Sequence, residues 1–190
     1  MIKIYRCVKS NLLSQGFGEA NTKPSLLYIY ESLGLLGHDG FDWAVKCQNN
    51  FVKTGGQCEN VYCDLVDGAT ITYIQKDVKN GYGIVAIDKE GDKHLWWHFD
   101  SISPALKVGD RIESGDLLGV GGNTGNSTGA HVHRAYYRYD EDPNNGYHGA
   151  TDMTPYMKNI FILDELKNMQ EQVGLLQQLV NLLKLLLNFK

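Results

Sequence analysis

A glycine-rich stretch that ends in two histidines constrains the fold of this chain more than any other segment. Residues Gly119–His133 read GVGGNTGNSTGAHVH, with five glycines before the first histidine. Glycine adopts left-handed backbone conformations at little steric cost, so this spacing favours a tightly turning loop over a helix. His131 and His133 then begin a predicted strand, where residues i and i+2 share a face and their Cα atoms lie about 6.6 Å apart. The loop therefore delivers two imidazole groups to one side of a sheet.

Short strands separated by turn dipeptides dominate the middle of the chain. The strand-like segments VYCDLV, ATITYIQK, IVAID and KHLWWHFDSI are separated by Asp67-Gly68, Asn80-Gly81 and Glu90-Gly91, which favour tight turns. The 21 glycines and 11% aromatic residues agree with a β-rich fold. We predict a mainly β fold, a compact antiparallel sheet or sandwich, with one short N-terminal helix over residues 24–32.

A heptad pattern marks the C-terminal end as a different structural unit. Its apolar residues step by four and three: Ile162, Leu166, Met169, Val173, Leu176, Val180, Leu183 and Leu187. A second apolar stripe consists of Leu175, Leu179, Leu182 and Leu186. Because a 3.5-residue period is typical of supercoiled helices, we predict a β domain over residues 1–156 and a coiled-coil-like amphipathic helix over residues 157–190.

This helix exposes too much apolar surface to remain alone. Self-association into a homo-oligomer through residues 159–190 is the favoured interpretation. Docking on its own domain, on another protein or on a membrane surface are the alternatives.

Composition excludes several other classes of protein. The net charge of −4 and the pI near 5.8 argue against a non-specific nucleic-acid binder. No stretch approaches the roughly 18 continuous apolar residues of a transmembrane span. The N-terminus lacks the apolar segment and small-residue cleavage site of a secretory signal, so we expect any export to use another route.

The four cysteines do not indicate a structural zinc site. Cys7 is isolated, and Cys47, Cys58 and Cys63 lack the Cys-x-x-Cys spacing of a zinc knuckle. Buried or free thiols are the favoured interpretation, and one local disulfide is the alternative.

The segment HDGFD holds a histidine and a carboxylate that could meet at one point. On a regular strand His38 and Asp42 would lie about 13 Å apart, too far for one metal ion. Gly40 between them permits a bent loop that brings the two side chains together. Taken alone, the segment is more typical of a surface loop whose polar side chains hydrogen-bond the turn.

The segment KHLWWHFDSI adds further imidazoles to the strands. Strict alternation divides its residues between two faces, with His94, Trp96 and His98 on one and Leu95, Trp97 and Phe99 on the other. We predict that the apolar face packs on the core and the histidine face borders a cleft. An ordinary strand with two exposed histidines is the alternative.

These separate features combine into one hypothesis about a metal centre. If His38, Asp42 and His133 bind a tetrahedral zinc ion, its fourth position stays open, as in catalytic zinc sites. His98 and His131 would then stand beside the open position as proton-transfer groups.

The same features resemble the lysostaphin/LytM-type zinc endopeptidases that cut peptidoglycan cross-links. The matching pieces are HDGFD, WWHFDSI, VGDRIESGDLLGVGG and TGNSTGAHVH, and together they cover roughly Leu13 to Tyr139. The resemblance implies a compact antiparallel β fold with one zinc ion at the base of a groove. It also implies that His38, Asp42 and His133 are the metal ligands and that His98 and His131 are catalytic.

Departures from the family pattern affect substrate choice more than catalysis. Arg134 stands where an apolar or aromatic residue is usual, WWHF replaces the usual Tyr-x-His-Leu, and the cysteine-bearing excursion after Trp43 is longer than expected.

The predicted function is a zinc-dependent endopeptidase that hydrolyses peptide cross-links of bacterial peptidoglycan at the cell wall. Trp96, Tyr136 and Tyr137 are candidates for lining the substrate groove, with ordinary packing as the alternative. The tail and the N-terminus together suggest a virion-associated or otherwise released lytic enzyme. The rival hypothesis is a non-catalytic assembly or binding module that keeps the fold, with the tail as its main function.

Overall fold

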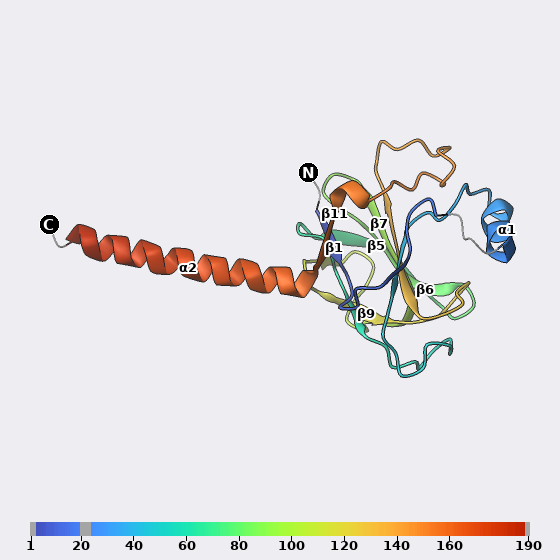
Figure 1. Ribbon diagram of the computed structural model, residues 1–190, viewed down its shortest axis with the longest axis horizontal. Coiled ribbons are helices and arrows are strands. Elements are labelled where there is room, and N and C mark those ends of the chain that lie inside the picture. The colour runs from blue at the N-terminus through green and yellow to red at the C-terminus, as the bar shows by residue number, and fades with distance from the viewer. Residues whose placement is uncertain (1–2, 20–23, 189–190) are drawn as a thin grey trace.

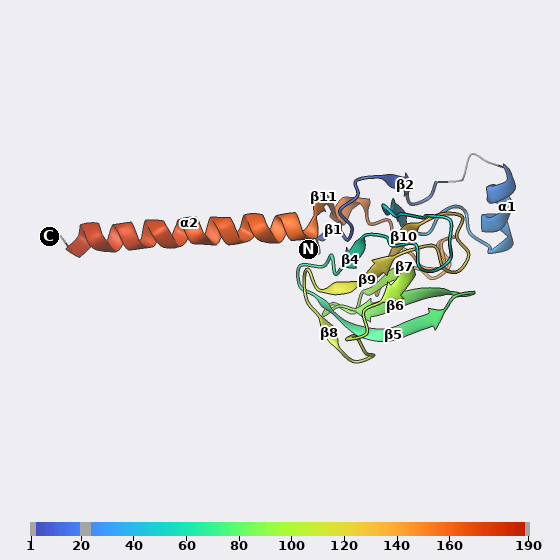
Figure 2. The same cartoon turned by 90° about the horizontal axis from the view of Figure 1, so that it is seen from below.

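A β domain from which one long helix projects makes up the molecule (Figures 1 and 2). The computed structural model describes residues 3–19 and 24–188, with the backbone alone for 24–27 and 185–188. The elements are β1 (Ile4–Arg6), β2 (Leu13–Gln15), α1 (Pro24–Ser32), β3 (Phe41–Ala44), β4 (Asn60–Tyr62), β5 (Ala69–Asp77), β6 (Gly81–Ile87), β7 (Lys93–Ile102), β8 (Arg111–Ile112), β9 (Leu117–Gly121), β10 (His131–Tyr137), the 3-10 turn η1 (Thr154–Tyr156), β11 (Met157–Phe161) and α2 (Ile162–Asn188).

One nine-stranded sheet holds most of the strands in the described part of the chain. Its main path runs β2-β3-β10-β7-β6-β5-β8, and β9 pairs with both β7 and β4. Every pairing in this sheet is antiparallel. The prediction of a mainly β, antiparallel fold with a short N-terminal and a long C-terminal helix is confirmed.

The core lies against one face of the strands at the centre of this sheet. Alternation on β3 buries Phe41 and Trp43, and alternation on β10 buries Val132. The residues between them, including Asp42 and His133, point to the opposite face and stay partly exposed. The sheet thus has an apolar side, and a polar side on which the site is built.

The C-terminal segment begins as a strand and not as a helix. Met157–Phe161 forms β11, which pairs in parallel with β1, and α2 begins at Ile162. The heptad pattern predicts the helix from about Asn159, but it cannot reveal a backbone pairing with a strand at the other end of the chain. The division of the chain after residue 156 stays a prediction.

The four cysteines form one disulfide and two free thiols, so each interpretation left open by the sequence applies to one pair. Cys47 and Cys58 form a disulfide, so the favoured assignment as free thiols is wrong for these two. Cys7 and Cys63 are buried free thiols. No helix within the described residues is long and apolar enough to cross a membrane.

Candidate active site

Three neighbouring strands bring the polar residues of the site into register. Asp42 on β3 lies opposite His133 on β10, and His133 lies opposite Trp97 on β7. Directly paired residues of antiparallel strands share a face, so the Asp42 carboxylate and the His133 imidazole project to the same side. His131, two residues before His133, projects to that side as well.

A β-bulge at His98 brings a further imidazole to this side. Trp97 pairs with Gly83 and Phe99 with Tyr82, so His98 is an extra residue on β7. Its φ of 69° lies in the left-handed region that non-glycine residues rarely adopt. The bulge turns His98 toward His131, and their ring centroids lie 4.6 Å apart.

The bulge also corrects the predicted faces of β7. His94 and Trp96 are fully buried in the core, whereas Leu95 and Trp97 are partly exposed. The prediction that the His94–Trp96 face borders a cleft is therefore wrong. A strictly alternating strand would place His98 on the same face as His94 and Trp96. The one-residue bulge reverses the face from His98 onward, so the His98 side chain reaches the opposite side.

Two of the predicted groove residues belong to the core. Trp96 is 0% exposed and Tyr136 is 1% exposed, so neither can contact a substrate in the groove. Both lie on the apolar side of the central strands, where aromatic rings bury a large area. Tyr137 is partly exposed, and the Lys93 ammonium lies 3.9 Å from its ring centroid. A substrate-binding role for Tyr137 stays a prediction.

The loop before β3 places His38 against the strands. Its backbone N–H donates to the carbonyl of Glu19, and its own carbonyl accepts from the N–H of Gly18. A side chain at Gly40 would put Cβ 2.7 Å from the Arg134 carbonyl oxygen and 2.8 Å from Cε1 of His133. Glycine at position 40 is thus required because the His133 ring packs directly on this backbone.

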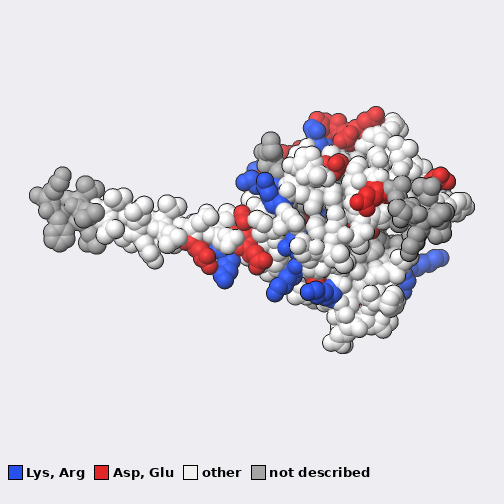
Figure 3. Space-filling model, viewed as in Figure 1, with Lys and Arg blue, Asp and Glu red and all other residues white. Residues whose placement is uncertain are grey.

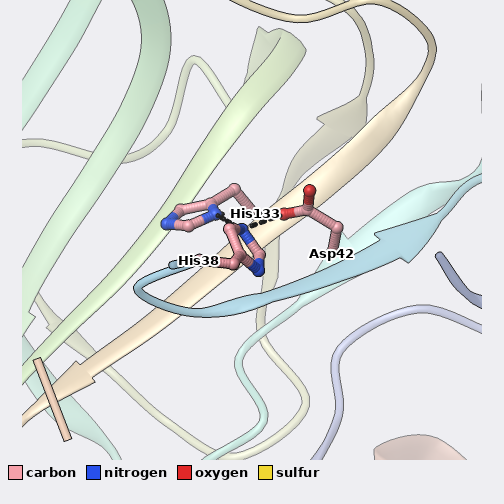
Figure 4. Close-up of side chains that lie close together, drawn as sticks. All are labelled: His38, Asp42 and His133. Atoms are coloured by element: carbon pink, nitrogen blue, oxygen red, sulfur yellow. Dashed lines mark hydrogen bonds and ion pairs between the residues drawn. The ribbon is translucent and has the colours of Figure 1, made fainter. Parts of the chain in front are cut away.

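Three donor atoms form a nearly equilateral triangle at the centre of the site (Figure 4). Nε2 of His38 and Nδ1 of His133 are 3.0 Å apart, Nδ1 of His133 and Oδ1 of Asp42 are 3.0 Å apart, and the third side is 3.1 Å. Zinc binds imidazole nitrogen and carboxylate oxygen at about 2.0–2.2 Å, which a point in front of such a triangle satisfies. The three residues therefore fit one face of a tetrahedral zinc site.

Backbone carbonyls determine which ring nitrogen faces the site in three of the histidines. Nδ1 of His38 is 3.2 Å from the Gly16 carbonyl, Nδ1 of His98 is 2.7 Å from that of Thr124, and Nδ1 of His131 is 2.8 Å from that of Gly129. A nitrogen that donates to a carbonyl carries the proton, so Nε2 of each ring keeps a free lone pair. Such partners fix ring orientation in metal sites.

His133 has the opposite orientation. Its Nδ1 is the nitrogen in the triangle, and its Nε2 lies 3.6 Å from Oδ1 of Asp39. No sequence pattern marks Asp39 as a site residue, because a carboxylate inside a histidine-bearing loop carries no signal of its own.

Burial and hydrogen bonding shift the pKa values of the site in opposite directions. Burial raises the pKa of Asp42, but the hydrogen bond from His133 and the imidazoles of His38 and His131 beside the carboxylate outweigh burial and hold that pKa well below its usual value. Burial lowers the pKa of His133, but the hydrogen bond to Asp42 and the charges of Asp42 and Asp39 leave it raised. Burial lowers the pKa of His98 to about 3, and burial also lowers that of His131.

A groove opens in front of these residues. One wall comes from α1 and the turn after it, with Ile29, Tyr30 and Leu33, and the other from residues 126–128 of the glycine-rich loop. The sequence alone does not predict the α1 wall. The only available signal was the i, i+4 spacing of Ile29 and Leu33, which indicates an apolar helix face but not what it borders.

Comparison with known proteins finds a family model that matches part of the chain and solved structures of similar fold. Residues 65–145 match the model of peptidase family M23. The resemblance to the lysostaphin/LytM-type enzymes is confirmed. The matched segment contains His98, His131 and His133, while His38 and Asp42 lie before it and join the site through the loop and β3.

Solved structures share the M23 fold at low sequence identity. A zinc-containing peptidase from Vibrio cholerae is 18% identical with a TM-score of 0.56, over 84% of this chain and 40% of that one. Csd3 from Helicobacter pylori is 16% identical with a TM-score of 0.54, over 93% and 42%. The antimicrobial peptidase lysostaphin from Staphylococcus simulans is 20% identical with a TM-score of 0.50, over 76% and 48%. The chain spans less than half the length of each of these three proteins.

Proposed function

We propose that this chain is a zinc-dependent endopeptidase that hydrolyses peptide cross-links of bacterial peptidoglycan. The donor triangle of His38, Asp42 and His133 is the observation that carries the proposal, because it leaves one side of a tetrahedral ion open toward the groove. The match of residues 65–145 to peptidase family M23 supports a peptidase, and the peptidoglycan substrate is the family-level part of the proposal.

Zinc bound at this triangle would polarise a scissile carbonyl and lower the pKa of a water molecule. His131 is placed to accept the proton of the attacking water, because its Nε2 is unprotonated and lies 3.5 Å from Oδ2 of Asp42. His98 faces the same space from the bulge. Its Nε2 is unprotonated as well, so it is a second candidate to accept the water proton, and the imidazole that takes this proton can pass it to the leaving amine.

The test combines metal content with activity. Purified protein should carry about one zinc ion per chain, and it should clear suspensions of bacterial cell walls until a chelator is added. Restored zinc should restore clearing, and mass analysis of the released fragments identifies the bond that is cut. Folded protein that binds no zinc, or clearing that survives in His133→Ala, would contradict the proposal.

The rival function is a non-catalytic assembly module that keeps the fold. It requires neither free Nε2 lone pairs beside the donor triangle nor a groove in front of them, so the geometry favours the peptidase. A virion-associated or released lytic role, and self-association through residues 159–190, stay parts of the proposal that the same protein preparation can test.

A further inference from the structure

Within the residues whose side chains the structure describes, helix α2 touches its own domain only over its first two turns. Ile162 is 1% exposed and packs with Phe161 and Tyr5, while Leu163 and Leu166 are partly buried against them. The Tyr5 hydroxyl donates to Oε1 of Glu165 at 3.1 Å. From residue 167 to residue 184 every side chain is exposed, and the helix projects freely (Figures 1 and 2). Docking on its own domain therefore leaves most of the apolar surface uncovered.

One stripe of apolar residues along the projecting part of α2, called the first seam, has the spacing of a self-associating coiled coil. It consists of Met169, Val173, Leu176, Val180 and Leu183, which are 42–66% exposed. Its steps of four and three give the 3.5-residue period that keeps a seam facing a neighbouring helix.

A second seam repeats the first one residue earlier. Leu175, Leu179 and Leu182 precede Leu176, Val180 and Leu183 by one position each, and they are 66%, 53% and 54% exposed. One residue rotates about 100° around an α-helix. The two seams are therefore parallel apolar stripes that face directions about 100° apart.

A two-stranded coil would cover only one of these stripes. In a closed ring of helices, each helix contacts two neighbours. Seen from that helix, the directions to its two neighbours differ by about 60° in a ring of three helices, about 90° in a ring of four and about 108° in a ring of five. The observed separation fits four or five. We propose that α2 assembles with the α2 helices of other copies of this chain into a closed bundle of four or five helices.

The polar residues of the helix favour identical copies over other partners. Between Gln172 and Lys184, the lysine is the only charged residue, so the flanking charges that select a different coil are missing (Figure 3). A membrane-surface helix would need a cationic polar face, whereas this polar face is built from Gln and Asn. Lys184, at the end of this stretch, is therefore its single source of charge repulsion between copies.

The bundle leaves the catalytic groove accessible. The groove is lined by residues of α1, and α1 lies at the end of the domain opposite to α2 (Figure 1). Copies joined through α2 therefore carry their grooves on the outside of the assembly.

The mass of the full chain in solution tests the proposal. Light scattering behind a sizing column should give four or five times the 21.3 kDa of one chain at tens of micromolar. Leu175→Gln/Leu179→Gln removes the second seam and should reduce the assembly to two copies or fewer, as should Leu176→Gln/Val180→Gln in the first seam. The matched control Glu171→Gln/Gln178→Ala lies outside both seams and should keep the wild-type mass.

A wild-type monomer, dimer or trimer would overturn the proposal. So would a Leu175→Gln/Leu179→Gln protein that keeps the wild-type mass, because a bundle that ignores the second seam is not the one proposed. Binding of monomeric protein to anionic phosphatidylglycerol vesicles would instead assign α2 to a membrane surface. Thermal melting of the β domain, which does not involve either seam, should be the same in all variants and shows that each has folded.

Discussion

Strand β10 carries a cluster of charged and imidazole groups on each of its faces, and the two clusters differ in how their hydrogen-bonding groups are satisfied. On the core face, Arg134 donates to both carboxylate oxygens of Asp64, with Nε 2.9 Å from Oδ2 and Nη2 3.1 Å from Oδ1. Its Nη2 also donates to Nδ1 of His94 at 3.1 Å, and Nε2 of His94 donates to Asp88 at 3.1 Å. Every one of these four residues is at most 9% exposed.

The site face holds the same kinds of residues without such matching. His38, His98 and His131 each donate one N–H to a carbonyl and turn an unprotonated nitrogen toward the groove. Lone pairs that converge repel one another, so this cluster needs a cation or a proton among them, and without a metal ion the Nδ1 proton of His133 takes that place.

Pairing, and not residue type, separates the structural cluster from the candidate catalytic one. His94 and His98 lie on the same strand, yet His94 closes a buried ion-pair network and His98 borders the candidate metal site. Disrupting the two clusters should therefore have opposite consequences. Changes on the site face should remove activity without loss of stability, and changes on the core face should reduce stability.

The largest effect on activity is expected when a member of the donor triangle is removed. His38→Ala should lower the rate of cell-wall hydrolysis about 1,000-fold or more, because Lewis-acid assistance is worth several kcal/mol and each 1.36 kcal/mol is tenfold. Its melting temperature in chelator should equal that of chelator-treated wild type. A much lower melting temperature of the variant under those conditions would show that His38 stabilises the fold, as the residues of the core-face cluster do.

The buried network should give the converse result. Asp64→Ala leaves the Arg134 guanidinium charged, buried and unpaired, so the free energy of unfolding should fall by about 3–5 kcal/mol. Denaturant unfolding measures this loss, and the protein that remains folded should still hydrolyse cell walls at the wild-type rate. The double variant Asp64→Leu/Arg134→Met removes both charges and should recover much of the loss. If the double variant is no more stable than Asp64→Ala, the ion pair is not the cause.

Proton transfer by His131 should contribute a smaller and separable effect. His131→Ala should lower kcat by about 100- to 10,000-fold, the usual range for a positioned acid or base. Zinc content should remain at one per chain, since His131 is not part of the donor triangle. Loss of zinc from this variant would make His131 a ligand and would contradict its assigned role.

Local patterns predict much of this molecule, and long-range pairing explains where they fail. The turn dipeptides, the i, i+2 pair on β10 and the heptads of α2 are features of neighbouring residues, so the sequence alone indicates them. The bulge at His98 depends on the register with β6, and it reverses which side chains of β7 reach the core. The partner of Arg134 is Asp64, 70 residues away, and no spacing rule connects them.

The smallest effect concerns pH, and its sign follows from the raised pKa of His133. A proton on His133 competes with zinc for the same ring, and this proton binds with a pKa above the usual value of about 6.5. Zinc affinity should therefore be constant above that pKa and fall as the pH drops through it, by about tenfold per pH unit for one proton. Because the pKa values of His98 and His131 are lowered, both stay neutral in this range and do not cause the loss of zinc affinity at low pH.

Asp39 provides the means to sharpen this prediction. Its carboxylate lies 3.6 Å from Nε2 of His133 and its charge contributes to the raised pKa. Asp39→Asn removes that charge at nearly constant volume, so the fall in zinc affinity should begin at a lower pH than in the wild type. Titration with a zinc-buffered indicator across pH 5 to 8 measures the shift. An unchanged profile would mean that Asp42 alone holds the proton on His133, and the donor triangle would then carry the whole pH dependence of the site.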